Sequence, residues 1–267
     1  MAIPFRLTVP VFLLSALMQA SGALPNICYL FEEEESIPRV QVDLFRNLEI
    51  PFSKNSARVT ENARFGRGCL RIGRLSGERS QGYAFEAMLR GAMLEQFREP
   101  VSRMTISLWL YRVGDTPVVM FRRMPGAPRS AGFFQWVLLK GEKTRFYFAA
   151  TAENGDEPGG YKTYELLSKA VFTVPPGEWN HLAMTFDQGV VSFYLNGRLA
   201  GEPQSVPYSV IPVATEPLSS ILAAAQLEEG SLVDEFLLLG DQALGEMEIL
   251  EIYEKGIANH TAQFGGK

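Results

Sequence analysis

Apolar and polar residues alternate with a period of two in many short segments of this chain. In 105–111, for example, Ile106, Leu108 and Leu110 fall on one side of an extended strand, because successive side chains of a strand point to opposite faces. Later segments repeat the alternation, and their apolar residues that share a side are Phe134, Trp136 and Leu138; Phe146 and Phe148; Leu182, Met184 and Phe186; and Val191, Phe193 and Leu195. The pattern predicts strands that each turn one face to a core.

The dipeptide Asn196-Gly197 predicts the turn of a hairpin. A type I′ turn requires positive φ at both central residues, which asparagine and glycine tolerate. Strands 190–195 and 198–202 should therefore pair in antiparallel fashion. Turn residues and β-rich runs predict further strands, at 28–33, 68–74, 81–87, 117–123, 169–174 and 232–239.

Helical periodicity is scarce. A turn or two is predicted at 91–97, and a helix is predicted within 242–256, where Leu244, Met247 and Leu250 recur at helical spacing before Gly256 ends it. Many strands, little helix and no alternation of strand with helix indicate an all-β protein. We expect a two-sheet antiparallel β-sandwich with one short C-terminal helix.

The first residues have the pattern of a secretory signal peptide. Arg6 is followed by an apolar run at 7–18 and by small residues that place Ser21 and Ala23 at a cleavage site. The alternative is a transmembrane anchor, but the run has only about 12 residues where a span needs roughly 20. We predict a signal peptide over 1–23, a sandwich domain over 24–258, a tail over 259–267, and export to the periplasm, cell surface or exterior.

Composition and charge narrow the classes of partner. Hydrophobic residues make up 46% and charged residues 21% of the chain, as in an ordinary globular domain. The balance of 25 Lys and Arg against 30 Asp and Glu argues against binding of nucleic acid and against a polybasic membrane anchor. No later segment is long and apolar enough to span a membrane.

The chain has two cysteines, Cys28 and Cys69, and both would remain after signal cleavage. Thiols outside the cytoplasm tend to pair, which predicts a Cys28–Cys69 disulfide. The alternative is two buried thiols that behave as small apolar groups. Two cysteines without clustered histidines do not make a zinc site.

A motif of the form W-x-H-[LIV]-A-x-[TS]-[FY]-D, followed by a strand ending in Y-x-N-G, runs through 172–202. Its residues here are Trp179, His181, Leu182, Ala183, Thr185, Phe186 and Asp187, then Tyr194, Asn196 and Gly197. A later stretch adds Asp234, Glu235, Leu244, Glu248, Ile249 and Tyr253. The order and spacing resemble the laminin G-like, concanavalin A-like jelly-roll family over roughly 28–256, most weakly at 124–168. The resemblance implies a jelly roll with a structural histidine at position 181.

The resemblance says less about function than about fold, because this fold hosts lectins, adhesion modules, glycosidases and lyases. A retaining glycosidase needs two carboxyls about 5 Å apart, but Asp234 and Glu235 are adjacent and should point to opposite faces, and the acidic residues at 32–35 are contiguous, so neighbours again point to opposite faces. We predict no catalytic residues and a secreted recognition module for a carbohydrate or a cell-surface partner. The alternatives are a polysaccharide-active hydrolase or lyase with dispersed carboxylates, and a purely structural envelope domain.

Carbohydrate binding would use exposed aromatic side chains that stack on sugar rings beside polar groups. The candidates are Trp109, Tyr111, Trp136, Tyr161 and Tyr164, of which the last two lie in a Gly-rich segment predicted to be a loop. The alternative for each is a place in the core or under a layer that covers the sheet.

Calcium is the one cofactor that the resemblance suggests, since many relatives hold it near the first and last strands. Glu32 and Glu33 with Asp234 could supply part of the shell of six to eight oxygens that calcium takes. The alternative is an exposed acidic edge that discourages association between sheets.

Overall fold

The computed structural model describes residues 24, 26–31, 40–42, 49–51, 56–73, 81–87, 97–126, 130–139, 144–153 and 160–257. The predicted signal peptide, the tail at 259–267, Glu32, Glu33 and most of the turn predicted at 91–97 lie outside these residues. No helix in the described part of the chain combines the length and the apolar character needed to cross a membrane.

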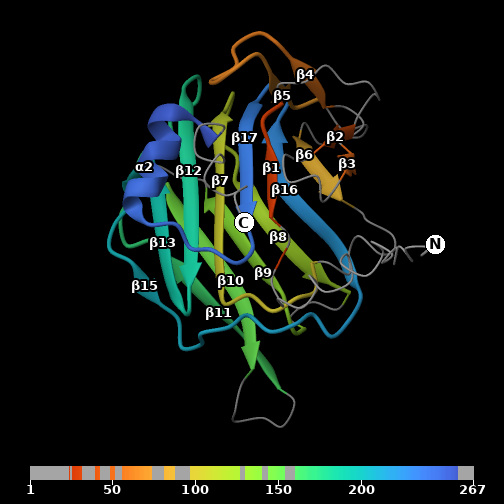
Figure 1. Ribbon diagram of the computed structural model, residues 1–267, viewed down its shortest axis with the longest axis vertical. Helices are drawn as coiled ribbons and strands as arrows, with labels where there is room; N and C mark the ends of the chain where they lie inside the picture. The colour runs from red at the N-terminus through yellow and green to blue at the C-terminus, as the bar shows by residue number, and fades with distance from the viewer. Residues whose placement is uncertain are drawn as a thin grey trace, which may run out of the picture.

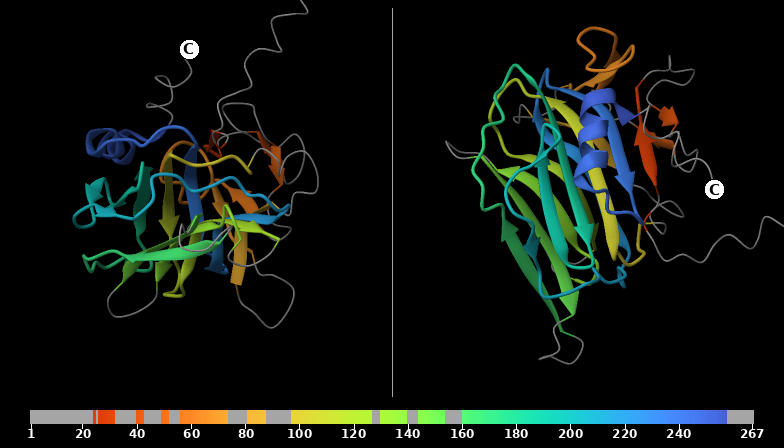
Figure 2. Two further views of the ribbon diagram at one scale, coloured as in Figure 1. Left: turned by 90° about the horizontal axis from the view of Figure 1, so that it is seen from below. Right: turned by 60° about the vertical axis from the view of Figure 1, so that its left-hand side comes forward.

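Two large sheets lie face to face (Figures 1 and 2). One has nine strands in the order β14-β13-β12-β7-β17-β5-β4, with β1 on β17 and β15 on β13; the other has six in the order β11-β10-β9-β8-β16-β6; β2 and β3 form a small third sheet. The strands are β1 (Ile27–Tyr29), β2 (Val40–Val42), β3 (Glu49–Pro51), β4 (Ala57–Val59), β5 (Cys69–Arg71), β6 (Gln81–Ala87), β7 (Arg103–Tyr111), β8 (Val118–Pro125), β9 (Phe134–Leu139), β10 (Arg145–Glu153), β11 (Tyr161–Leu167), β12 (Trp179–Asp187), β13 (Val190–Leu195), β14 (Arg198–Leu199), β15 (Gln204–Ser205), β16 (Leu218–Glu228) and β17 (Leu232–Leu239). The antiparallel sandwich predicted from the alternation is confirmed.

The core lies between the two large sheets. The alternating apolar residues predicted to share a face do so: Ile106, Leu108 and Leu110 of β7 meet Trp136 of β9 and Phe148 of β10 in one buried cluster. Sandwiches of this kind bury the inner face of each sheet, and the outer face is free either to be covered by other elements or to meet solvent and ligands. The two outer faces therefore decide where a ligand can bind.

Helix α2 (Glu246–Lys255) covers the outer face of the nine-stranded sheet (Figure 2). Ile249 and Ile252 of the helix are buried in a second apolar cluster with Ala183 of β12 and Leu237 of β17. Gly256 follows the helix with φ of 79° and ends it, as predicted. The outer face of the nine-stranded sheet is thus packed beneath a helix, which leaves the outer face of the six-stranded sheet uncovered by any described helix.

The predicted hairpin is confirmed at Asn196 and Gly197, whose φ angles are 50° and 78°. They join β13 to β14, which pair in antiparallel fashion. A Cβ atom on Gly197 would lie 2.9 Å from Cβ of Tyr253 in α2. The turn therefore needs glycine both for its backbone conformation and because the helix approaches so closely.

Gly197→Ala should lower the free energy of unfolding by about 2–3 kcal/mol, because it combines left-handed backbone strain with crowding against α2. Gly230→Ala is the matched control, since Gly230 has φ of 87° but the nearest atom to an added Cβ is 3.7 Å away. The free energy of unfolding of that variant should fall by only about 1 kcal/mol, the cost of the backbone strain alone. Urea unfolding measures both, and equal losses would mean that the approach of α2 contributes nothing.

One predicted strand lies elsewhere in the structure. The segment predicted at 169–174 forms only an isolated bridge between Phe172 and Thr144. The strand instead occupies Tyr161–Leu167, which was predicted to be a loop, and it pairs with β10 along its full length. The outermost position of β11 explains the error, because an edge strand has alternating partly exposed residues and no continuous apolar run.

The expected Cys28–Cys69 disulfide is not formed, and both residues are buried thiols. The topology gives the reason, since β1 and β5 pair with successive parts of the same edge of β17. Cys28 lies opposite Leu237, whereas Leu70 lies opposite Val233 and places Cys69 one residue further along. The two cysteines are therefore offset by three residues of β17, or roughly 10 Å along the strand, which exceeds the Cα separation of about 7 Å that a disulfide tolerates.

Candidate functional site

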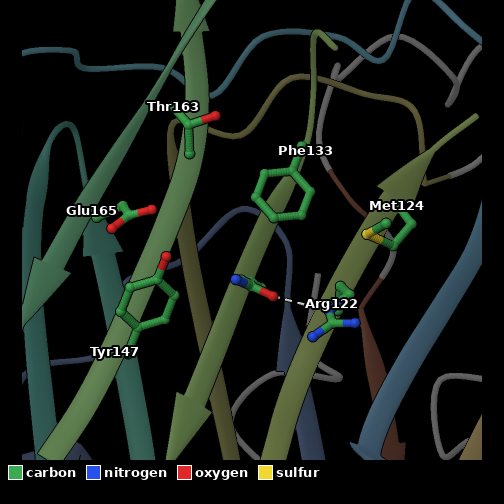
Figure 3. Close-up of a pocket in the computed structure, with 7 residues that line it drawn as sticks. Arg122, Met124, Phe133, Tyr147, Thr163 and Glu165 are labelled. Carbon is green, nitrogen blue, oxygen red and sulfur yellow. Dashed lines mark hydrogen bonds between the residues drawn. The ribbon is translucent and has the colours of Figure 1, made fainter. Parts of the chain in front are cut away.

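A pocket of about 310 Å³ opens on the outer face of the six-stranded sheet. Four neighbouring strands, β8 to β11, supply its walls and floor (Figure 3). Its lining residues are Arg122, Met124, Phe133, Gln135, Tyr147, Thr163 and Glu165. Two aromatic rings, one thioether and five groups able to form hydrogen bonds, the hydroxyl of Tyr147 among them, thus face the same space.

The side chains of the pocket form two sides with aromatic rings between them. In Figure 3, Thr163 and Glu165 line one side, Arg122 and Met124 line the opposite side, and the rings of Phe133 and Tyr147 lie between them. This arrangement places ring surfaces between polar groups on both sides. Flat apolar surfaces beside convergent polar groups are the usual means of binding a polar small molecule with orientation.

The polar groups of the pocket act on one another across the strands. Arg122 donates a hydrogen bond from Nε to Oε1 of Gln135 at 3.0 Å. Burial raises the pKa of Tyr147, and hydrogen bonding to Glu165 and its negative charge act in the same direction, whereas hydrogen bonding to Gln135 opposes them. Mutual interactions of this kind restrict side-chain rotation before a ligand arrives, which lowers the entropic cost of binding.

Arg123 points to the other side of β8, and its guanidinium group supports the pocket from beneath. Nε donates to the carbonyl of Gly132, the residue before Phe133. Nη1 donates to the carbonyls of Phe97 at 3.0 Å and Glu99 at 2.6 Å, and Nη2 to that of Pro212 at 3.1 Å. Burial lowers the pKa of Arg123 to about 9, so the group keeps its charge at neutral pH. This one side chain joins three separate loop segments to β8.

Two of the predicted ligand-binding aromatics are removed from the candidate site by their burial. Trp136 faces the core between the sheets. Trp109 lies on the outer face of the nine-stranded sheet, but α2 covers it: its ring stacks on Tyr253 with centroids 5.3 Å apart. The guanidinium of Arg64 lies 4.5 Å from the Trp109 ring centre on the same covered face. A sugar could reach neither indole.

The three predicted tyrosines are only partly buried and are not brought together. Tyr111 lies edge-on to Trp179 at 5.8 Å on the nine-stranded sheet. Tyr164 turns its ring toward Tyr208, 5.3 Å away. Tyr161 begins β11, the strand that also carries Thr163 and Glu165. None of the three lines the pocket, so their role as ligand contacts stays a prediction.

His181 is buried beneath α2, as expected for a structural histidine. Its Nε2 lies 2.7 Å from Oγ of Ser107, and its ring lies 5.2 Å from that of Trp109. Nδ1 has no hydrogen-bond partner in the described part of the chain. Burial lowers the pKa of His181 to about 3, so the imidazole is neutral.

Asp234 is the one predicted calcium ligand within the described residues. It is buried, and its carboxylate accepts hydrogen bonds from backbone amides. Its Oδ2 accepts hydrogen bonds from the amides of Arg64 at 2.8 Å and Phe65 at 3.1 Å, and its Oδ1 from that of Glu235 at 2.9 Å. The described residues include no group of three or more histidine, cysteine or acidic side chains that could hold a metal ion. Because Glu32 and Glu33 lie outside these residues, the calcium site stays a prediction.

Carboxylate pairing is the test of glycosidase chemistry, since that reaction needs an acid and a nucleophile or base about 5–10 Å apart. Among the described residues that line the pocket, Glu165 is the sole carboxylate. Glu235 does not supply a second one there, because its Oε2 accepts the amide of Ile257 at 3.0 Å beside the end of α2. Among the described residues, the pocket therefore offers no second acid for hydrolysis.

Sequence reasoning missed every residue that lines the pocket. A usable signal existed in the alternation itself, because the residues between the core positions of β9 and β10 must face outward. Gln135 lies between Phe134 and Trp136, and Tyr147 lies between Phe146 and Phe148. Attention to these polar and aromatic partners would have found the floor of the pocket.

The fold and the pocket together define a jelly-roll sandwich with a cleft on one outer sheet. Residues 90–241, more than half of the chain, match the family model described as the concanavalin A-like lectin/glucanases superfamily. The chain therefore belongs to this superfamily. No curated protein matches the chain significantly.

Solved structures of low sequence identity share the fold. The binding domain of botulinum neurotoxin serotype G matches 85% of this chain with a TM-score of 0.54 and 11% identity. This chain spans only 50% of that structure. Domain 4 of AbnA, a GH43 extracellular arabinanase from Geobacillus stearothermophilus, matches 86% of this chain and 98% of its own length, with a TM-score of 0.53 and 14% identity. At these identities the likeness extends to the fold alone.

Proposed function

We propose that this protein is an exported, non-catalytic recognition module that binds carbohydrate in the pocket on the outer face of β8 to β11. The observation that carries the proposal is the convergence of Phe133 and Tyr147 with Arg122, Gln135 and Glu165 around one space. Ring faces can stack on the apolar side of a sugar, while amide, guanidinium and carboxylate groups bond its hydroxyls.

Two further observations support the proposal. The similar domain of the arabinanase was solved in complex with arabinotriose, a short neutral oligosaccharide. Glu165 alone among the described lining residues is a carboxylate, which favours binding over hydrolysis. Export rests on the charged start, apolar run and small-residue end of 1–23.

Tyr147→Ala and Phe133→Ala should each weaken binding of an oligosaccharide about tenfold, because each removes one ring surface from the centre of the contact. A glycan array on the purified chain would find the ligand, and isothermal titration would then give the dissociation constants. Release of reducing ends from the same glycans would instead support the enzyme alternative.

Tyr111→Ala is the matched control, because it removes the same side chain from the outer face of the opposite sheet. It should leave affinity within about twofold of the original value. A loss in Tyr111→Ala with none in Tyr147→Ala would move the ligand site to the nine-stranded sheet and contradict the proposal.

A further inference from the structure

The outer face of the pocket sheet carries balanced charge. Alternation along β8, β10 and β11 turns Arg122, Arg145, Glu153 and Glu165 outward, two cations against two anions among the described residues of β8 to β11. The pocket itself holds one of each, Arg122 and Glu165. No cationic patch of the kind that attracts sulfated or carboxylated polymers is present among these residues.

The two charges of the pocket lie on its opposite sides (Figure 3). Arg122 is on β8 and Glu165 on β11, three strand spacings apart, or roughly 14 Å. An oligosaccharide that lies across the pocket must therefore pass both. A chain that carries an acid on each sugar would gain at Arg122 and be repelled at Glu165.

A neutral sugar meets no such conflict, because a hydroxyl group both donates and accepts hydrogen bonds. It can accept from the guanidinium of Arg122 and donate to the carboxylate of Glu165, and hydrogen bonds to charged partners are the stronger kind. The cation is also already held by Gln135 through its Nε. The pocket thus offers complementary partners to hydroxyls at both of its sides.

We infer that the pocket selects uncharged, hydroxyl-rich oligosaccharides over sulfated or uronic-acid chains, and that Glu165 is the specificity-determining residue that rejects the anionic ones. The inference rests on the proposed function, since it concerns the same pocket. Glu165 suits the role because it is an exposed residue on an edge strand, where substitution does not disturb the core.

The test compares the original chain with Glu165→Gln by isothermal titration. The neutral probes are arabinotriose and cellohexaose, and the anionic probes are trigalacturonate and a heparin hexasaccharide. The original chain should bind a neutral probe with an affinity that changes less than about twofold when salt rises from about 50 to about 300 mM. Glu165→Gln should weaken neutral binding, because an amide accepts a weaker hydrogen bond than a carboxylate does, and it should raise the ratio of anionic to neutral affinity at least about fivefold.

Glu153→Gln is the matched control, because it removes the same charge from the same face of the sheet outside the pocket lining. It should leave the preference for neutral probes unchanged. Equal shifts in the two variants would overturn the inference, as would tighter binding of the original chain to trigalacturonate or heparin. That last result would leave the proposed function standing, whereas failure of every probe and of the glycan array would remove both.

Discussion

Arg123→Met should lower the free energy of unfolding by about 4 kcal/mol or more, the largest loss that we expect from any single substitution in this chain. The guanidinium supplies hydrogen bonds to four backbone carbonyls, those of Phe97, Glu99, Gly132 and Pro212. A thioether of similar length fills much of the space but leaves these acceptors without a donor in a buried place. Each such orphaned group costs about 1–3 kcal/mol. Urea unfolding monitored by tryptophan fluorescence measures the loss.

Arg122→Met gives a matched comparison, because it makes the same chemical change one residue away on the outward side of β8. Arg122 is only partly buried, so its stability should change by less than about 1 kcal/mol. Its effect should fall on ligand binding instead. If the two variants unfold at the same urea concentration, the view that Arg123 joins the loops to the sheet is wrong.

Acidification should weaken the fold already between pH 6.5 and 5, above the range in which most carboxylates become protonated. Burial lowers the pKa of His181 to about 3 in the folded chain, against about 6.5 when unfolded. The unfolded state therefore binds about half a proton more at pH 6.5 and nearly one more at pH 5, and stability falls as pH drops through the unfolded value. The expected slope is about 1.4 kcal/mol per pH unit, which amounts to about 2 kcal/mol at pH 5.

His181→Gln tests the assignment, because glutamine keeps a hydrogen-bonding group beside Ser107 and does not titrate. The variant should be less stable than the original at pH 8, but its unfolding free energy should be flat between pH 6.5 and 5. Urea unfolding at several pH values compares the two slopes. An unchanged slope in the variant would assign the acid sensitivity to another group.

The strands were predictable where a local rule decides them. Asn196-Gly197 forms its turn because few other residue pairs tolerate two positive φ angles in succession. Inward positions such as Phe146 and Phe148 were predictable because alternation leaves no other place for a core. Strand β11 was missed because an edge strand is half exposed and has no continuous apolar run.

The pocket was harder to predict because of an irregularity in β8. Strict alternation from Val118 would turn Arg122 inward and Arg123 outward. The register of β8 against β9 instead shifts between Val119 and Phe121, and such a bulge exchanges the two faces beyond it. Nothing local in the run of residues at 118–125 shows where the extra residue falls. The sequence therefore could not say which arginine meets a ligand and which holds the loops.

The tryptophan side chains show a second limit of prediction from the sequence. Trp109 lies on the outward side of β7, as the alternation indicates, but whether that side meets water depends on where α2 packs. The contacts between Tyr253 and Trp109 join residues far apart in the chain. Local pattern predicts which face a side chain takes, and tertiary packing decides whether that face is covered.

The helix over the nine-stranded sheet makes the two outer faces of the molecule different, because only the opposite face carries the pocket. Met247 lies on α2 with 75% of its surface exposed. That helix packs on the nine-stranded sheet, whereas the pocket lies on the six-stranded one. Both native thiols are buried, so a cysteine introduced as Met247→Cys would be the readily accessible one for maleimide coupling. A chip surface attached there would leave the pocket side facing outward, in a single orientation.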